Sequence, residues 1–354
     1  MSNYELFRIF AMFLVLMVHS DFFFLGFEFS VASVTANPSA TFLQLEVESL
    51  TIIAVDCFVL LSGFFGIRTR FRSVSNIMFQ VFFWQLTMTT YGYLIHGITF
   101  LTALKNIFSL TGNWFVECYL MLMFVAPFLN NYTEKITEKQ LLKFIITFYT
   151  FQTFYGYILR DWPFLDRYSL VSFIGLYLLG RYINLYGGDK LVKVKSFSHG
   201  FLKYFIISTI VTLCIWGLFM LGREGMGYWL LRRSYMYLSP FVVYSAVCLL
   251  KAFGKLQIKP SQLINKIAAS AFAVYLIHMQ SYGILKSLCQ WNFHTFGPYL
   301  YWLIDILTMA CIFIICILMD QLRIWAWKRI WPHLEKLWPH TTTHPDNSEI
   351  KPHT

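Results

Sequence analysis

The chain has 354 residues, of which 57% are hydrophobic, 19% aromatic and only 13% charged, and its formal net charge is +10. A soluble globular domain carries about 25% charged residues, so this composition excludes a soluble protein and indicates one that is integral to a membrane. Basic loops on the cytoplasmic side of a membrane explain the positive charge, and we expect no nucleic-acid partner.

Ten apolar segments follow one another along the chain, each close to the roughly 20 residues that a membrane-spanning helix needs. They predict an all-α membrane protein with about ten transmembrane helices in one bundle, joined by mostly short connections. The segments lie at about 5–27, 49–67, 74–95, 113–131, 140–159, 168–186, 201–221, 234–250, 264–287 and 299–319.

The distribution of Lys and Arg predicts the orientation of these spans. With the N-terminus in the cytoplasm, about three of every four of the 28 Lys and Arg residues fall on the inner side. An even number of spans with both termini in the cytoplasm produces this bias, and an odd number would spoil it.

We expect one membrane domain, residues 1–320, followed by a short cytoplasmic tail, residues 321–354. The tail begins with a stretch rich in Trp and Arg, at 323–329, that is typical of an interfacial amphipathic turn, and its polar end predicts disorder. The longest external segment is at about 28–48, where Glu28, Glu46 and Glu48 are expected to form a solvated rim.

The seven cysteines lie in or beside apolar segments, and none belongs to a CxxC pair. Their spacing predicts neither a disulfide framework nor a zinc site. We therefore expect no metal and no permanently bound cofactor.

Ionisable residues inside the spans are the first candidates for function, because each costs about 2.5–3.5 kcal/mol to insert into hydrocarbon. For the last three of them a structural role is the favoured interpretation. The candidates are Arg8, His19, Asp56, Glu117, His278 and Asp305.

His19 and Asp56 form the pair that the sequence favours most. His19 follows Arg8 by eleven residues, about 16 Å along the helix, and Asp56 is expected about 10 Å below the outer surface on the next span. A carboxylate beside an imidazole fixes its tautomer and stabilises its protonated form, as general-base catalysis requires. A purely structural contact between two helices is an equally good interpretation of this pair.

Three arginines, Arg68, Arg70 and Arg72, follow the sequence Ser-Gly-Phe-Phe-Gly of residues 62–66 on the predicted inner side. Positive residues at such a place keep a loop in the cytoplasm. Arginine also matches the geometry of phosphate, and glycine lets a ligand approach the backbone closely. A phosphate clamp is therefore the second interpretation of this loop.

These segments together resemble the acyltransferase-3 family of membrane acyltransferases. The opening of that family has an Arg, ten residues and then a His in its first span, and its second span has a Val-Asp followed by aromatics and Ser-Gly-Phe. The matching segments are 5–11 with Val15 and His19; 55–64; Asn113, Trp114 and Phe115 with Tyr119 and Pro127; and 273–278, which ends in Tyr-Leu-Ile-His.

The resemblance implies an O-acyltransferase of the bacterial plasma membrane. Such an enzyme moves an acyl group, usually acetyl, from cytoplasmic acyl-CoA to a hydroxyl of a surface or extracellular glycan. By this likeness Arg8, Arg68, Arg70 and Arg72 bind the phosphates of CoA, and His19 is the base that Asp56 orients. Residues expected to support the site or the acceptor are Trp114, Glu117, Tyr119, His278 and Asp305.

Two other functions remain open. A transporter or flippase for a lipid-linked saccharide also uses buried charges at mid-membrane, although residues 1–160 and 161–320 show no internal repeat. A glycan polymerase would favour a large catalytic external loop, whereas the segment at about 28–48 is modest and has no Lys or Arg.

Overall fold

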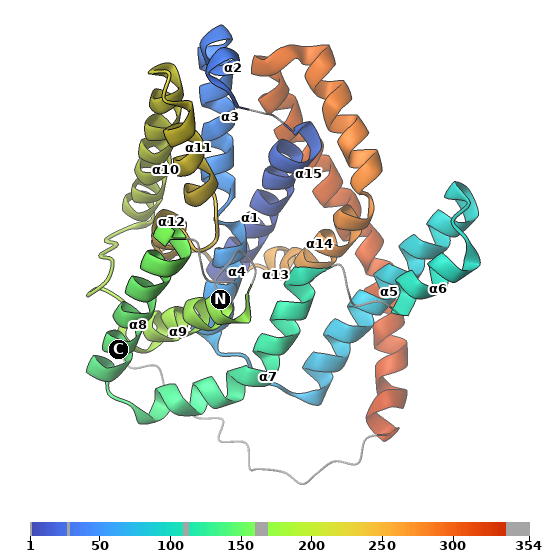
Figure 1. Cartoon of the computed structure of the whole chain (residues 1–354). Coiled ribbons are helices and arrows are strands. Elements are labelled where there is room, and N and C mark those ends of the chain that lie inside the picture. Colours follow the sequence, from blue (N-terminus) through green and yellow to red (C-terminus); the bar gives the residue numbers. More distant parts are fainter. Residues whose placement is uncertain (1, 27–28, 109–112, 160–168, 338–354) are drawn as a thin grey trace.

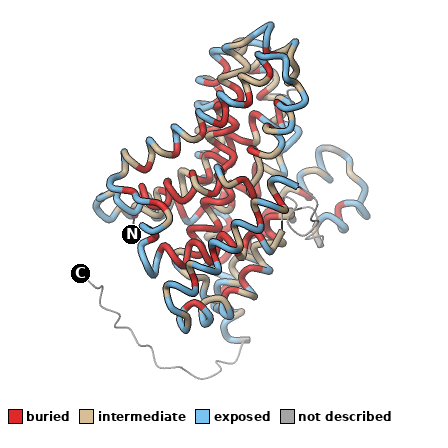
Figure 2. The backbone as a smooth tube through the Cα atoms, turned by 60° about the vertical axis from the view of Figure 1, so that its left-hand side comes forward, coloured by how far each residue is buried: buried red, intermediate tan, exposed pale blue. Residues whose placement is uncertain are grey.

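The computed structural model describes residues 2–26, 29–108, 113–159 and 169–337, and every regular element within them is a helix (Figure 1). Buried residues, red in Figure 2, gather along the centre of the bundle. The elements are α1 Ser2–Val18, η1 His19–Leu25, α2 Val31–Ala36, α3 Pro38–Thr51, α4 Ala54–Phe65, α5 Phe71–His96, α6 Phe100–Phe108, α7 Trp114–Lys135, α8 Glu138–Phe151, η2 Gln152–Leu159, α9 Leu170–Tyr186, α10 Phe197–Met220, α11 Glu224–Ser234, α12 Pro240–Gly254, α13 Gln262–Ala269, α14 Ala271–Gln280 and α15 Tyr282–Leu337.

Five helices among the described residues are long and apolar enough to cross a membrane. This finding supports an all-helical membrane protein, while ten crossings and cytoplasmic termini stay predictions. The five are Ser2–Leu25, Pro38–Phe65, Trp114–Lys135, Phe197–Met220 and Tyr282–Lys336, and two shorter apolar helices are Leu170–Tyr186 and Pro240–Gly254.

The segment expected to be external, at about 28–48, is largely helical. It contains α2 and most of α3, and α3 continues into α4 as one apolar candidate span. Pro38 stands at the first helical position of α3, where its missing N–H leaves no hydrogen bond unmade. Glu46 and Glu48 are only 7% and 5% exposed, so the expected solvated rim is wrong for both of them. Glu28 lies outside the described residues.

The last helix, α15, is interrupted at Gly297, whose positive φ of 71° takes the chain out of the helical path just before Pro298. The two arms lie side by side, orange and red in Figure 1, and Asn292 Nδ2 on the first donates to Thr308 Oγ1 on the second at 3.2 Å. The second arm continues to Leu337. The interfacial turn expected at 323–329 is therefore part of a long helix, and residues 338–354 lie outside the described part.

Helices α4 and α9 cross closely, because two glycines let their backbones approach each other. A Cβ atom on Gly63 would lie 2.1 Å from the carbonyl oxygen of Tyr177, and one on Gly180 would lie 2.3 Å from that of Leu60. Small residues allow this close approach between helices in membranes. Gly63 therefore serves helix packing, rather than the approach of a ligand.

A charge pair ties the loop after α9 to the end of α12. Lys251 is 7% exposed and donates to Asp189 at 2.5 Å and to the carbonyl of Val192 at 2.6 Å. The hydrogen bond from Lys251, together with its charge, lowers the pKa of Asp189 from its ordinary value.

Candidate active site

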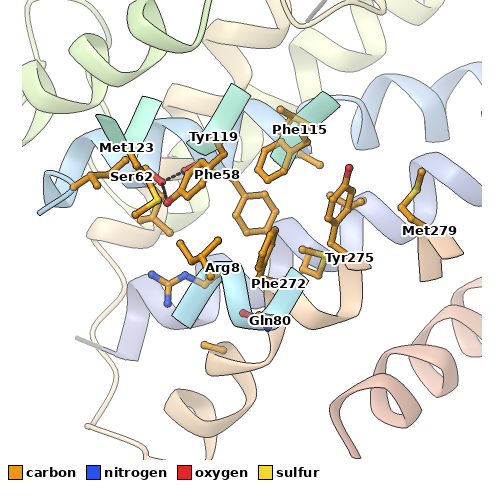
Figure 3. A pocket seen from close by; sticks show the side chains of 18 of the residues that line it. Arg8, Phe58, Ser62, Gln80, Phe115, Tyr119, Met123, Phe272, Tyr275 and Met279 are labelled. Atoms are coloured by element: carbon orange, nitrogen blue, oxygen red, sulfur yellow. Dashed lines mark hydrogen bonds between the residues drawn. The ribbon is translucent and has the colours of Figure 1, made fainter. Parts of the chain in front are cut away.

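A cavity of about 690 Å³ runs beside α1, between walls supplied by α1, α4, α5, α7 and α14 (Figure 3). Arg8 and Arg68 line it, and so does His19. Arg8 and His19 are eleven residues apart on one continuous helical stretch, so the cavity reaches about 16 Å along this stretch from Arg8 to the imidazole of His19. The aromatic rings of Phe58, Phe115 and Phe272 also line the cavity, and in Figure 3 they lie between Arg8 and Tyr275.

His19 stands where α1 passes into the π-helical segment η1. Short π-helical turns inside α-helices are frequent at functional sites. The side chain of His19 is half-buried. Its Nδ1 lies 2.7 Å from Nε2 of His278, and the ring of Phe23 meets it edge-on at 5.1 Å. His19 therefore lines the cavity while it is held from behind by a second imidazole.

His278 determines which nitrogen of His19 is free. Its Nδ1 lies 2.7 Å from the carbonyl oxygen of Val274. A carbonyl only accepts, so this Nδ1 carries the proton and Nε2 of the neutral ring is an acceptor. His19 Nδ1 must then be the donor to His278. Nε2 of His19 keeps its lone pair, as a general base requires.

The predicted contact of His19 with Asp56 is not formed. Asp56 is fully buried in the first turn of α4, and among the described residues neither of its carboxyl oxygens has a hydrogen-bond partner. Ala54 and Val55 line the cavity, whereas Asp56 does not. Helical rise gives the depth of a residue but not the direction of its side chain. The partner of His19 is His278, which the sequence assigned only a supporting place.

Two of the four predicted phosphate ligands reach the cavity. Arg8 pairs with Glu5, Nη1 to Oε2 at 2.6 Å, and Arg68 is exposed. Arg70 and Arg72 do not line the cavity. The guanidinium of Arg72 lies instead over a tryptophan ring of α15, 5.4 Å from its centroid.

The loop that carries Arg68 is fixed by hydrogen bonds to α7 and α9. The Ile67 N–H donates to Tyr177 Oη at 2.9 Å, and that hydroxyl donates to Asn130 Oδ1 at 2.7 Å. Asn130 Nδ2 returns a hydrogen bond to the Ile67 carbonyl at 3.0 Å. One residue beyond Arg68, the hydroxyl of Thr69 donates to a carbonyl of α7 at 2.5 Å. The loop is thus held on both sides of Arg68.

The aromatic segment at the start of α7 forms one wall. Trp114 lines the cavity and stacks on Tyr237, with ring centroids 5.7 Å apart. Tyr119 also lines it, and its hydroxyl lies 3.2 Å from Ser62 Oγ (Figure 3). Glu117 does not line the cavity. Ser62 was not among the sequence candidates, because a serine in an apolar span carries no distinctive signal.

Buried carboxyl groups lie beside η1, outside the cavity. Asp305 is fully buried and accepts a hydrogen bond from Ser20 Oγ at 2.6 Å. Asp21 accepts from Gln44 Nε2 at 2.8 Å, and a threonine of α10 donates to Glu46 at 2.7 Å. These bonds join η1 to α15 and α3 to both η1 and α10. In the described part of the chain, no group of three or more His, Cys, Asp or Glu side chains could hold a metal ion.

The family of the chain follows from a comparison with family models. The model of the acyltransferase domain Acyl_transf_3 matches residues 1–321, which is most of the sequence. The chain belongs to the acyltransferase-3 family. This membership and the apolar helices make it a membrane acyltransferase. No curated protein and no solved structure matches the chain.

Proposed function

We propose that this acyltransferase moves an acyl group, acetyl in the simplest case, from cytoplasmic acyl-CoA to a hydroxyl of a surface or extracellular glycan. The observation that supports the proposal is the cavity that joins Arg8 and Arg68 to His19. Guanidinium groups suit the phosphates of CoA, and an imidazole with a free lone pair suits a hydroxyl. A donor that enters past the arginines extends its thioester toward the imidazole.

Direct transfer needs one base beside the thioester. The acceptor oxygen attacks the thioester carbonyl carbon while Nε2 of His19 takes the hydroxyl proton. The C–S bond then breaks, CoA leaves as a thiolate, and the imidazolium returns the proton to the sulfur. The hydrogen bond from Nδ1 of His19 to His278 stabilises the imidazolium. The aromatic walls keep water away from the thioester.

A transport function is the less favoured alternative. Family membership gives the chain an acyltransferase domain over residues 1–321, and a flippase has no need for a base at the end of an arginine-lined cavity. A glycan polymerase that works through a large external loop is also less favoured, since residues 31–51 are mostly helical.

The proposal is tested with the full-length protein in lipid vesicles, radiolabelled acetyl-CoA outside and a glycan acceptor enclosed, the cytoplasmic loops facing outward. We expect His19→Ala to lower the rate of labelling by roughly 10²–10⁴-fold, the usual contribution of a positioned base. His294→Ala, an exposed site on α15, is the matched control. Unchanged labelling by His19→Ala would remove His19 as the base.

The donor end is tested by kinetics. Arg68→Ala is expected to raise the KM for acetyl-CoA by roughly 10- to 150-fold with little change in kcat, because a charge-assisted hydrogen bond contributes about 1.5–3 kcal/mol. Mass spectrometry of surface glycan from cells with and without the protein identifies the acceptor. Glycans of identical acylation in the two strains would refute the proposed acceptor class.

A further inference from the structure

We propose that Gln80 binds the pantetheine arm of the acyl donor, through a hydrogen bond to one of its amides. This inference rests on the proposed function, and it assigns a donor-binding residue beyond the arginines and the imidazole. The side-chain Nε2 of Gln80 has no hydrogen-bond partner among the described residues. Gln80 lies in the cavity wall, between Arg8 and Tyr275 in Figure 3.

The first observation is an unused amide in an apolar surrounding. Gln80 is only 4% exposed, and its Nε2 has no hydrogen-bond partner among the described residues. A buried donor without a partner costs about 1–3 kcal/mol, so such groups are rare and call for an explanation. Gln80 also lines the cavity, and there a ligand supplies the missing partner.

The second observation is the direction that α5 gives to this side chain. Ser73, Ile77 and Gln80 all line the cavity, and their spacing of four and three residues places them on one face of a helix. Gln80 therefore stands about 10 Å along α5 from Ser73. In Figure 3 it lies between Arg8 on one side and Tyr275 and Met279 on the other.

The chemistry of the donor matches this place. Acyl-CoA carries its phosphates at one end and its thioester at the other, and the pantetheine arm between them is apolar except for two amide groups. Among the described residues no hydrogen bond fixes Nε2 of Gln80, so rotation about the last bond of the side chain presents either an N–H or a carbonyl to the arm. On the opposite wall, the hydroxyls of Ser62 and Tyr119 already form a hydrogen bond with each other. The amide nitrogen of Gln80 has no such partner among the described residues.

The test compares two ligands that differ only in this arm. CoA has the phosphates and the pantetheine, whereas adenosine 3′-phosphate 5′-diphosphate keeps all three phosphates and lacks the pantetheine. Binding of both is measured by calorimetry on the full-length protein in lipid nanodiscs, for the wild type, Gln80→Leu and Arg68→Ala. Gln280→Leu, an exposed glutamine at the end of α14, is the matched control.

We expect Gln80→Leu to weaken CoA binding by roughly three- to tenfold, the loss of one neutral hydrogen bond, and to leave the binding of adenosine 3′-phosphate 5′-diphosphate unchanged. Arg68→Ala weakens both ligands. The melting temperature of ligand-free Gln80→Leu stays the same or rises, because the variant removes an unpaired buried donor. If Gln80 instead stabilised the fold, Gln80→Leu would lower the melting temperature.

Two results would overturn the inference: equal binding of CoA by Gln80→Leu and the wild type, or an equal loss of both ligands. If Arg68→Ala still weakens both ligands, the first of these results refutes the role of Gln80 alone. A wild-type protein that binds neither ligand would refute the proposed acyl-CoA function itself.

Discussion

Replacement of His278 by leucine tests whether His278 or Asp56 is the residue that orients His19. In the wild type, His19 Nδ1 donates to His278 Nε2 at 2.7 Å, and this bond becomes charge-assisted when His19 takes the acceptor proton. A hydrogen bond to a charged group contributes about 1.5–3 kcal/mol, so its loss lowers kcat by roughly 10- to 150-fold. The KM for acetyl-CoA is expected to stay unchanged, because His278 does not line the cavity.

The assay is the initial rate of glycan acylation at saturating acetyl-CoA, with thermal unfolding measured in parallel. His278→Gln is the conservative variant, since its amide oxygen accepts from His19 and restores part of the rate. Asp56→Asn is the comparison, and we expect less than a threefold effect on kcat, since Asp56 makes no hydrogen bond to His19 and does not line the cavity.

The opposite pattern would refute this reasoning. If Asp56→Asn lowers kcat as strongly as His19→Ala while His278→Leu retains full activity, a carboxylate and not an imidazole orients the base. A rise in the KM for acetyl-CoA alone, with kcat unchanged, would place His278 in donor binding instead.

Three further predictions concern the frame around the site. Asn130→Ala removes two hydrogen bonds at the arginine loop and raises the KM for acetyl-CoA in a kinetic assay, whereas the exposed neighbour variant Asn131→Ala does not. Gly63→Ala places a Cβ against the α9 backbone and lowers the melting temperature by the equivalent of about 1–3 kcal/mol or more, while Gly217→Ala, with open space, does not. Asp189→Asn slightly lowers the melting temperature at neutral pH. This loss fades as pH falls through the lowered pKa of the carboxyl, because the wild-type ion pair then disappears too.

Much of the helical framework was predictable from apolar length, because a membrane leaves few other structures for such segments. The predicted range 74–95 corresponds to α5, and 201–221 corresponds to α10. The structure of region 28–48 was harder to predict from the sequence, since its helices bury Glu46 and Glu48 against other helices. Local polarity suggests solvent there, and only tertiary packing reverses that conclusion.

The site was predictable by residue type but not by pairing. Arg8 and His19 line one cavity as their spacing on α1 implies. Asp56 matched His19 in depth, but depth says nothing about rotation around the helix axis. The partner, His278, comes from a segment 259 residues away, and its role depends on the Val274 carbonyl that fixes its tautomer.

Of the four arginines expected to bind phosphate, only Arg8 and Arg68 line the cavity. Arg8 is held by Glu5 on α1, and Arg68 by a loop that Asn130 and Tyr177 fix from both sides. An arginine on a fixed backbone loses less conformational entropy when it binds phosphate than one on a free loop. The guanidinium of Arg72 makes a cation–π contact with a tryptophan ring of α15. This contact joins α5 to α15, and under the proposed function it leaves the phosphates of the donor to Arg8 and Arg68.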